Sequence, residues 1–374
     1  MVGNLVVSTS LYIHIPWCLH KCSYCDFYSL PSASDAVPGS GYVDRLIEEI
    51  NVSAINGTLH SIFLGGGTPS MIAPSDLGRL LNSISKKYDM PSEITLEANP
   101  ETLNESVLRE LRAVGFTRLS CGVQSFDAGQ LQFLERVHSA DKARDALRAA
   151  SRAGFENRNL DLIYTLPSQT MADLENDLHD AIALEPTHIS AYQLIVEPGT
   201  PLERKVESGD VTLPDEEIAI AMWHRVRKIL GEAGYTAYEV SNFAQPGFEC
   251  IHNVHYWECG DYLGIGTGAV SRIGQHRWRR ARNTKSYMMG ELHVDQEEYL
   301  TDQEMRTEVC MLGLRMTCGL DLERFESRFG KSFESFYPGR IAAWKEKGLA
   351  TGDSHLQLTP SGMLLLDSLV SELV

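Results

Sequence analysis

Three cysteines near the start of the chain have a spacing that suits a metal centre. Cys18, Cys22 and Cys25 form the pattern C-x3-C-x2-C directly after a β-rich run at Leu11–Ile15, so one short loop can bring three thiols together. Cysteine thiolates hold iron–sulfur clusters, normally four for a cubane, so three leave one iron open to another ligand. We therefore expect these cysteines to be the metal ligands of a 4Fe–4S cluster.

The same loop also fits other kinds of site. The alternatives are a zinc site completed by a distant histidine or cysteine, a ferredoxin-like electron carrier with a remote fourth cysteine, and a dithiol formed by Cys22 and Cys25. Structural zinc sites commonly combine two short ligand pairs. Among the other cysteines, just Cys250 has a cysteine or histidine within three residues, which is His252. The sequence therefore gives only weak support for a second pair of zinc ligands.

The cysteine loop needs a scaffold, and the first two hundred residues supply a β/α repeat. Short β-rich runs alternate with stretches of helical periodicity. The runs are Leu11–Ile15, Ser61–Leu64, Glu93–Glu97, Leu119–Val123, Leu160–Tyr164 and His188–Leu194. Such alternation implies parallel strands with right-handed crossovers. We predict an α/β fold with a partial (β/α)6 barrel of the TIM type, whose ligands bind at the carboxyl ends of the strands.

Two further segments follow the barrel. A proline- and glycine-rich stretch breaks the repeat before an amphipathic helix at Glu217–Glu232. From Thr301 the pattern gives three helices, a polar hairpin at Thr351–Leu358 and a last helix, which predicts a C-terminal α+β region ending in a winged-helix-like module. We place the barrel at residues 1–200, a linking helix with strands at 201–300, and the module at 301–374.

The charge of the chain limits its partners. Against 33 Lys and Arg stand 50 Asp and Glu, giving a formal net charge of −17 that repels phosphates and anionic surfaces. From Thr301 onward, eight Lys and Arg face eleven Asp and Glu, so the winged helix lacks a basic face and we expect no nucleic acid partner. Without an apolar span or a signal peptide, we expect a cytoplasmic protein whose membrane contact is at most peripheral.

Six motifs follow one another in the order found in the oxygen-independent coproporphyrinogen oxidase family of the radical-SAM superfamily. They are Tyr12-Ile-His14-Ile-Pro16-Trp17-Cys18, Gly65-Gly66-Gly67-Thr68-Pro69, Glu97-Ala-Asn99-Pro100, Gly122-Val-Gln124-Ser125-Phe126, Asp161-Leu-Ile-Tyr164 and His188-Ile-Ser190-Ala-Tyr192. The chain resembles this family over nearly its whole length. It departs at Thr165 and Ser168, where related sequences often have glycine.

The resemblance implies a radical-SAM barrel whose cluster binds S-adenosylmethionine. An electron from the reduced cluster then cleaves the sulfonium to methionine and a 5′-deoxyadenosyl radical, which requires an electron donor. By the same resemblance, the residues that contact this S-adenosylmethionine are Tyr12, Gly66 and Glu97. A neighbouring second pocket is lined by Tyr24, Gly67, Thr68, Gln124, Arg136 and Asp161.

Two features separate the chain from the oxidase itself. The oxidase has a fourth cysteine two residues after the third, where this chain has Phe27. The segment His252-Asn253-Val-His255-Tyr256-Trp257 resembles the H-N-x-x-Y-W motif of the haem chaperone branch of the family, HemW. This resemblance implies a protein that binds haem and transfers it to an acceptor, such as a respiratory haem protein. Oxidative decarboxylation of coproporphyrinogen III to protoporphyrinogen is the alternative, and enzymatic turnover and dimer formation stay open.

The chemistry of this segment suits haem. The imidazole of His252 or His255 can ligate haem iron, and the rings of Tyr256 and Trp257 can stack on a porphyrin. The alternative is that these side chains pack in the core. A nearby basic run at Arg277–Arg282 can pair with haem propionates, or it is a solvated strand that offsets nearby acids.

Overall fold

The computed structural model describes residues 8–33, 36–55 and 57–373. In these residues one large sheet has the strand order β14-β13-β12-β11-β1-β4-β5-β6-β7-β8-β10-β9. Its middle strands are β1 (Ser8–Ile15), β4 (Thr58–Gly66), β5 (Ile94–Ala98), β6 (Arg118–Gln124), β7 (Asn157–Tyr164) and β8 (His188–Gln193). These six pair in parallel, which confirms the six predicted strands. Within the described residues the two edges of the sheet do not pair, so the barrel is partial, as predicted.

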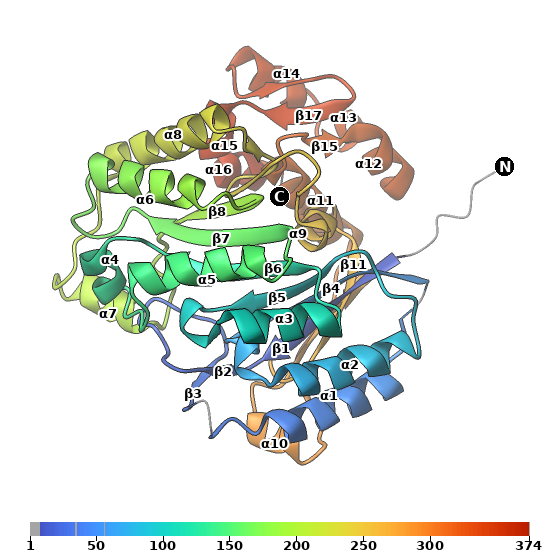
Figure 1. Ribbon diagram of the computed structural model, residues 1–374. Coiled ribbons are helices and arrows are strands. Elements are labelled where there is room, and N and C mark those ends of the chain that lie inside the picture. The colour runs from blue at the N-terminus through green and yellow to red at the C-terminus, as the bar shows by residue number, and fades with distance from the viewer. Residues whose placement is uncertain (1–7, 34–35, 56, 374) are drawn as a thin grey trace.

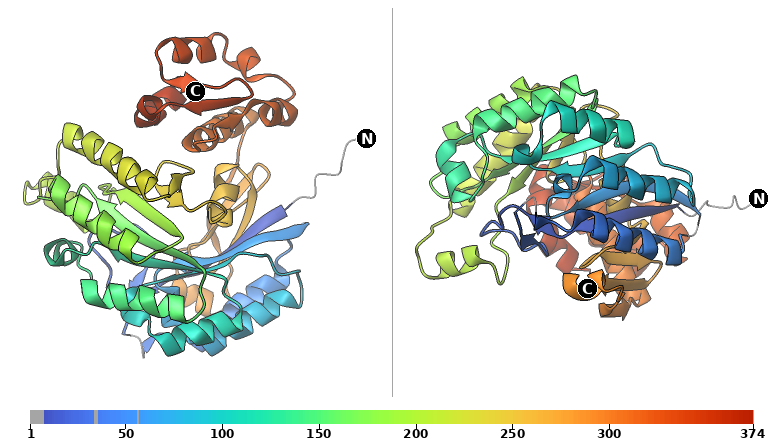
Figure 2. Two further views of the ribbon diagram at one scale, coloured as in Figure 1. Left: turned by 45° about the horizontal axis from the view of Figure 1, so that its top comes forward. Right: turned by 60° about the horizontal axis from the view of Figure 1, so that its bottom comes forward.

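Amphipathic helices cover the outer face of the parallel strands (Figures 1 and 2). They are α1 (Gly39–Val52), α2 (Pro74–Ser85), α3 (Glu105–Val114), α5 (Ala140–Arg152), α6 (Met171–Ala183) and α8 (Glu216–Glu232). Local signals fix their starts: in α6, Thr170 and Asp173 form a reciprocal capping box, and Ser139 caps α5. The main core lies between these helices and the strands, where side chains such as Leu46 and Leu160 are fully buried.

Strands from residues 201–300 extend the same sheet at both edges. On one side they are β11 (Asp261–Ile265), β12 (Val270–Ile273), β13 (His276–Arg280) and β14 (Val294–Tyr299); on the other they are β10 (Asn242–Ala244) and β9 (Thr236–Ala237). The strand β11 runs parallel to β1, although some 250 residues separate them in the sequence. The chain thus returns to the first strand after completing the repeat.

The turn after β7 contains both departures from the family pattern. Thr165 and Ser168 adopt positive φ angles of 58° and 61°, a left-handed conformation that favours glycine. The Thr165 hydroxyl compensates in part, because it donates to Tyr164 O (2.6 Å) and accepts from Leu194 N (3.2 Å). The turn keeps the glycine-type backbone without the glycines.

The C-terminal module has a hydrophobic core of its own, centred on Phe325, Phe333 and Trp344. Its helices are α11 (Asp302–Arg315), α12 (Leu322–Phe329), α13 (Phe333–Phe336), α14 (Arg340–Glu346), α15 (Pro360–Leu364) and α16 (Leu366–Ser371). A small sheet joins β15 (Leu320–Asp321), β17 (His355–Leu358) and β16 (Ala350–Thr351). This arrangement confirms the predicted winged-helix-like module, which lies apart from the parallel strands in Figure 2. No described helix has the length and apolar character of a membrane span.

Candidate cluster and ligand site

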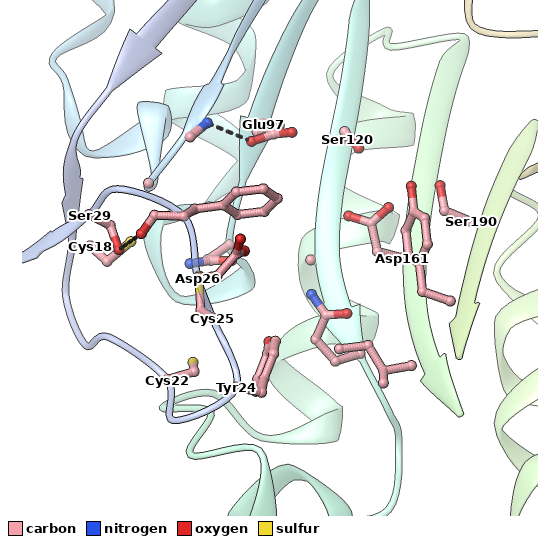
Figure 3. Close-up of a pocket in the computed structure, with 18 of the residues that line it drawn as sticks. Cys18, Cys22, Tyr24, Cys25, Asp26, Ser29, Glu97, Ser120, Asp161 and Ser190 are labelled. Atoms are coloured by element: carbon pink, nitrogen blue, oxygen red, sulfur yellow. Dashed lines mark hydrogen bonds between the residues drawn. The ribbon is translucent and has the colours of Figure 1, made fainter. Parts of the chain in front are cut away.

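The cysteine loop lies over the carboxyl ends of the parallel strands. Cys18 stands in β2 (Trp17–Cys18), just after β1, and β2 pairs with β3 (Leu30–Pro31) on the far side of the loop. Cys18, Cys22 and Cys25 line a cavity of about 430 Å³. Figure 3 shows the loop facing Glu97 and Asp161 from across this cavity. The structure therefore brings the predicted metal ligands and both predicted carboxylates to one place.

The three thiols line one cavity and are the ligand type of an iron–sulfur cluster, whereas no three His, Cys, Asp or Glu side chains of the described residues form a group that could hold a single metal ion. Burial raises the pKa of Cys18, and burial together with the neighbouring thiols raises that of Cys25 to about 11. A nearby cationic centre is therefore needed to keep all three as thiolates. Arg136 supplies part of that charge, because its Nη1 lies 3.8 Å from the Cys22 sulfur.

The cysteine that sequence reasoning offered as a second zinc ligand lies elsewhere. The Cys250 thiol is buried and faces Glu93 Oε1 at 3.5 Å. Neither Cys250 nor any other cysteine outside the loop is among the described residues that line the cysteine cavity. The loop thus supplies three thiols, and no fourth thiol lines the cavity among the described residues.

The glycine motif holds the loop against the end of β4. Gly67 N donates to Ile15 O (2.7 Å), and a side chain at Gly67 would meet Trp17 O at 2.5 Å. Gly66 has a φ of +104°, and a Cβ there would stand 2.3 Å from the ring of His14. Thr68 is buried beside Cys18 and accepts a hydrogen bond from Asn99 Nδ2 (3.0 Å). These glycines are required by protein contacts, in addition to any approach of a ligand.

Two buried carboxyl groups face the cavity from different strands. Burial raises the pKa of Glu97 to about 8, and the nearby Asp161 adds to the shift. Glu97 accepts a hydrogen bond from Gly66 N (3.1 Å), and Asp161 accepts one from Asn159 Nδ2 (2.7 Å). A cationic ligand, such as one carrying an ammonium or sulfonium group, would favour the ionised form of these carboxyl groups and offset the cost of their burial.

The other predicted contacts lie around the same cavity, apart from Tyr12 and from Thr68, which is buried beside Cys18 and is not among the lining residues. Arg136 Nη2 donates to Asn99 Oδ1 (2.6 Å) and to Gly122 O (3.0 Å), which fixes the guanidinium. Gln124 lines the cavity from a backbone with a φ of +72°, and Tyr24 lines it with a pKa raised by burial. Tyr12 instead lines an adjoining cavity, where its hydroxyl donates to His14 Nδ1 (3.0 Å).

That second cavity, of about 730 Å³, lies between the barrel and the C-terminal module. Much of its wall is aromatic: Tyr12, Phe27, Phe63, Tyr164, Tyr192, Trp223, Tyr256 and Trp257. The module contributes Arg315 and Met363 among others. Gly66 and Glu97 line both cavities, so the two chambers share a wall. Sequence reasoning missed most of these aromatic residues because they come from strands and helices far apart in the chain.

The helix α9 (Ile251–Trp257) brings three of the four predicted haem residues to this second cavity. The lining residues are His252, Tyr256 and Trp257. The Nδ1 of His252 is hydrogen-bonded to Ser61 Oγ (2.8 Å), whereas its buried Nε2 has no partner among the described residues. Burial lowers the pKa of His252 to about 3, so the imidazole is neutral.

The fourth residue, His255, lies outside the cavity. Its Nε2 donates to Asp261 O (2.8 Å), and its ring lies against that of His60, tilted by 30° and with 4.5 Å between the centroids. Gly260 packs against it so closely that a Cβ there would be 2.3 Å away from the ring. His255 therefore has a packing role in this structure, and the structure does not bring it together with the other three.

The basic run at Arg277–Arg282 is largely engaged with protein acids. Arg277 pairs with Glu298 (2.7 Å) and Glu308 (3.2 Å). Arg279 pairs with Asp295 (2.8 Å), and Arg280 with the buried Glu49 (2.6 Å). These contacts favour the interpretation of a strand that offsets nearby acids over that of a propionate site.

Comparisons with known proteins agree with this architecture. The family model of the Radical SAM superfamily matches residues 12–181, and that of the HemN C-terminal domain matches residues 300–365. A solved structure, coproporphyrinogen III oxidase (HemN) from Escherichia coli, is similar with a TM-score of 0.84 at 24% identity, covering 99% of this chain and 91% of that one. This likeness shows the shared fold.

Curated relatives are more similar in sequence. The heme chaperone HemW of Haemophilus influenzae is 36% identical over 96% of both chains. The heme chaperone HemW of Bacillus subtilis is 37% identical over 95% of this chain and 96% of the relative. Similarity at this level over the full length places the two in one family with the present chain. The chain therefore belongs to the HemW family of the radical SAM superfamily.

Proposed function

We propose that the protein is a haem chaperone that binds haem in the second cavity and transfers it to an acceptor protein. The observation that carries this proposal is His252, a neutral imidazole that lines the second cavity with an unpartnered Nε2. Neutral imidazole nitrogen is a common ligand of haem iron. A volume of about 730 Å³ lies within the range of ligand pockets, and the aromatic wall suits a flat apolar macrocycle.

The first cavity supports a cluster with S-adenosylmethionine. Cys18, Cys22 and Cys25 would hold a 4Fe–4S cluster, and the buried Glu97 and Asp161 would face the cationic part of S-adenosylmethionine. When bound, the reduced cluster and S-adenosylmethionine supply one-electron chemistry. The protein contributes the burial that keeps water away and the carboxyl groups that orient the ligand.

The mouth of the two cavities suits the transfer of an apolar ligand. Phe27 and Ile195 line both cavities and are 63% and 64% exposed. Exposed apolar side chains at a cavity rim favour contact with a partner that also buries apolar surface. The oxidase branch has a cysteine where this chain has Phe27. In this chain an apolar side chain at the cavity rim therefore stands in the place of a fourth thiol. We therefore favour haem transfer over coproporphyrinogen oxidation.

The remaining partner assignments rest on sequence reasoning. An electron donor for the cluster, a respiratory haem protein as acceptor and a dimer stay predictions. The same holds for the cytoplasmic location with peripheral membrane contact.

Haem titration tests the proposal. Purified wild type, His252→Ala and His255→Ala are titrated with haem while the Soret band is followed. We expect wild type and His255→Ala to bind alike and His252→Ala to bind more weakly. The reason is that His252 lines the cavity and its Nε2 has no partner among the described residues, whereas the Nε2 of His255 donates to Asp261 O. Equal binding by all three would remove His252 as the ligand, and absence of binding by wild type would refute the haem function.

A second assay separates transfer from oxidation. Protein reconstituted anaerobically with iron and sulfide is incubated with a reductant, S-adenosylmethionine and coproporphyrinogen III. We expect no protoporphyrinogen above the level of a Cys25→Ser variant. In parallel, haem-loaded protein is mixed with an apo-haem protein, and haem should move to it. Sustained turnover of coproporphyrinogen would overturn the chaperone proposal.

A further inference from the structure

The last residue of α11, Arg315, places a cationic group at the second cavity. Its side chain lines the cavity from the C-terminal module, and its guanidinium stacks 4.9 Å from the ring of Trp257. The buried Nε has no hydrogen-bond partner, and no Asp or Glu of the described chain forms an ion pair with Arg315. A buried Nε–H group without an acceptor is costly, because this donor loses water without replacement.

The same wall carries a second orphaned donor. The buried Nε1 of Trp257 also lacks a partner among the described residues. Both guanidinium and indole groups can donate hydrogen bonds but cannot accept them. Two contacting side chains that both lack an acceptor indicate that the missing partner is an acceptor brought by the ligand. An anionic oxygen would satisfy both, and would also balance the charge of Arg315.

Arg315 is the one arginine among the described residues that line this cavity, and it lacks the polar partners that two other arginines have. Arg277 is paired with Glu298 and Glu308. The Nε of Arg227 also lacks a partner, but its Nη2 donates to the carbonyls of Glu239 and Val240 at 3.4 Å, and its guanidinium stacks on Trp223 at 4.3 Å. Arg315 thus differs from these two arginines in having an aromatic contact alone.

Three acidic residues, Glu97, Glu239 and Asp367, line the same cavity. The buried Glu239 accepts hydrogen bonds from Ser241 N and Asn242 Nδ2, both at 2.7 Å, so its carboxylate is engaged. Asp367 of α16 lines the cavity from an exposed position and forms no ion pair with any described residue. Glu97 stands at the far side, on the wall shared with the cysteine cavity. An anionic ligand group would therefore be attracted by Arg315 and opposed by Asp367.

We propose that Arg315 and Trp257 together form a carboxylate anchor for the ligand of the second cavity. This inference rests on the proposed haem function, under which the carboxylate is a haem propionate. Arg315 belongs to the module and His252 to the segment that joins the sheet, so one ligand would contact both parts. The module then contributes directly to ligand binding, in addition to packing.

The anchor is tested by comparing haem with its dimethyl ester, which keeps the macrocycle and the iron but lacks both carboxylates. The full-length protein is titrated with each compound under identical conditions. We expect wild type to prefer haem by about 10- to 100-fold, the range for a hydrogen bond to a charged group. Arg315→Gln should lose this preference by weakening haem alone, whereas the matched control Arg277→Gln should keep it.

Two results would overturn the anchor while leaving the haem function intact. They are an unchanged preference in Arg315→Gln, and an equal loss of affinity for haem and ester. If wild type bound neither compound, the proposed function would fail and the anchor with it. If Arg315→Gln does not fold, Asp367→Asn serves as the test, because Asp367 is exposed. Removal of this opposing carboxylate should increase the preference for haem over the ester. An unchanged preference would contradict the anchor.

Discussion

Replacement of Gly66 by alanine should destabilise the protein strongly, because two costs coincide at this position. Gly66 has a φ of +104°, and the new Cβ would stand 2.3 Å from His14 Cε1 and 2.4 Å from His14 Nδ1. The ring cannot turn away freely. Its Nε2 donates to Tyr28 O (2.8 Å), so its Nδ1 must accept from the Tyr12 hydroxyl (3.0 Å).

Gly154→Ala provides the matched control. Gly154 has a φ of +88°, but nothing lies within 4 Å of an added Cβ. Both variants incur the backbone strain of about 1–3 kcal/mol. Gly66→Ala adds about 1–3 kcal/mol of overpacking and about 1 kcal/mol for a lost hydrogen bond. We therefore expect Gly66→Ala to be less stable than Gly154→Ala by about 2–4 kcal/mol.

Urea unfolding followed by circular dichroism measures this difference. The metal-free protein is used, so that loss of a cofactor does not contribute. Equal destabilisation of the two variants would refute the reasoning, because it would show that the His14 ring moves at no cost. A lower iron content of Gly66→Ala after anaerobic reconstitution should accompany the loss, since the glycine motif holds the cysteine loop.

Three further changes should have measurable effects. Cys25→Ser should lower bound iron below about four per chain, whereas Cys250→Ser should not, because that thiol is buried against Glu93 Oε1 at 3.5 Å; equal iron loss would contradict the assignment. Burial raises the pKa of Glu97 from 4.5 to about 8. The contribution of Glu97 to the free energy of unfolding is therefore fully present below pH 4.5 and is lost as the pH rises towards 8. Glu97→Gln in metal-free protein should flatten this part of the curve of urea midpoint against pH, and an unchanged slope would refute the assignment. Ser168→Gly should stabilise the protein by up to about 1 kcal/mol in urea unfolding, because it relieves a left-handed serine; a destabilised variant would show that the serine side chain is needed.

The parallel strands could be predicted because both faces of each are buried. Such strands appear as short apolar runs, as in the segment Leu160–Tyr164 at the end of β7. The strands β13 and β14 at one edge could not, because they have no such pattern: every residue of β14 is exposed, and β13 is rich in arginine. The pairing of β11 with β1 depends on the closure of a loop of about 250 residues, for which local sequence carries no signal.

The candidate site was predictable where residue type alone decides the chemistry. Three cysteines in one loop and carboxylates at strand ends fall into this class. Sequence could not distinguish His252 from His255, because they stand three residues apart on one short helix and differ in what packs against them. Nor could it show that Arg277 is paired while Arg315 is free of acids, since the partners come from distant elements.

The central claim is that His252 presents its imidazole to haem in the second cavity. Electron paramagnetic resonance of ferric haem bound to the protein tests it most directly, because the signal reports the axial ligand. We predict one imidazole-type signal in wild type and in His255→Ala, and its loss in His252→Ala. The same signal in all three proteins would contradict the claim.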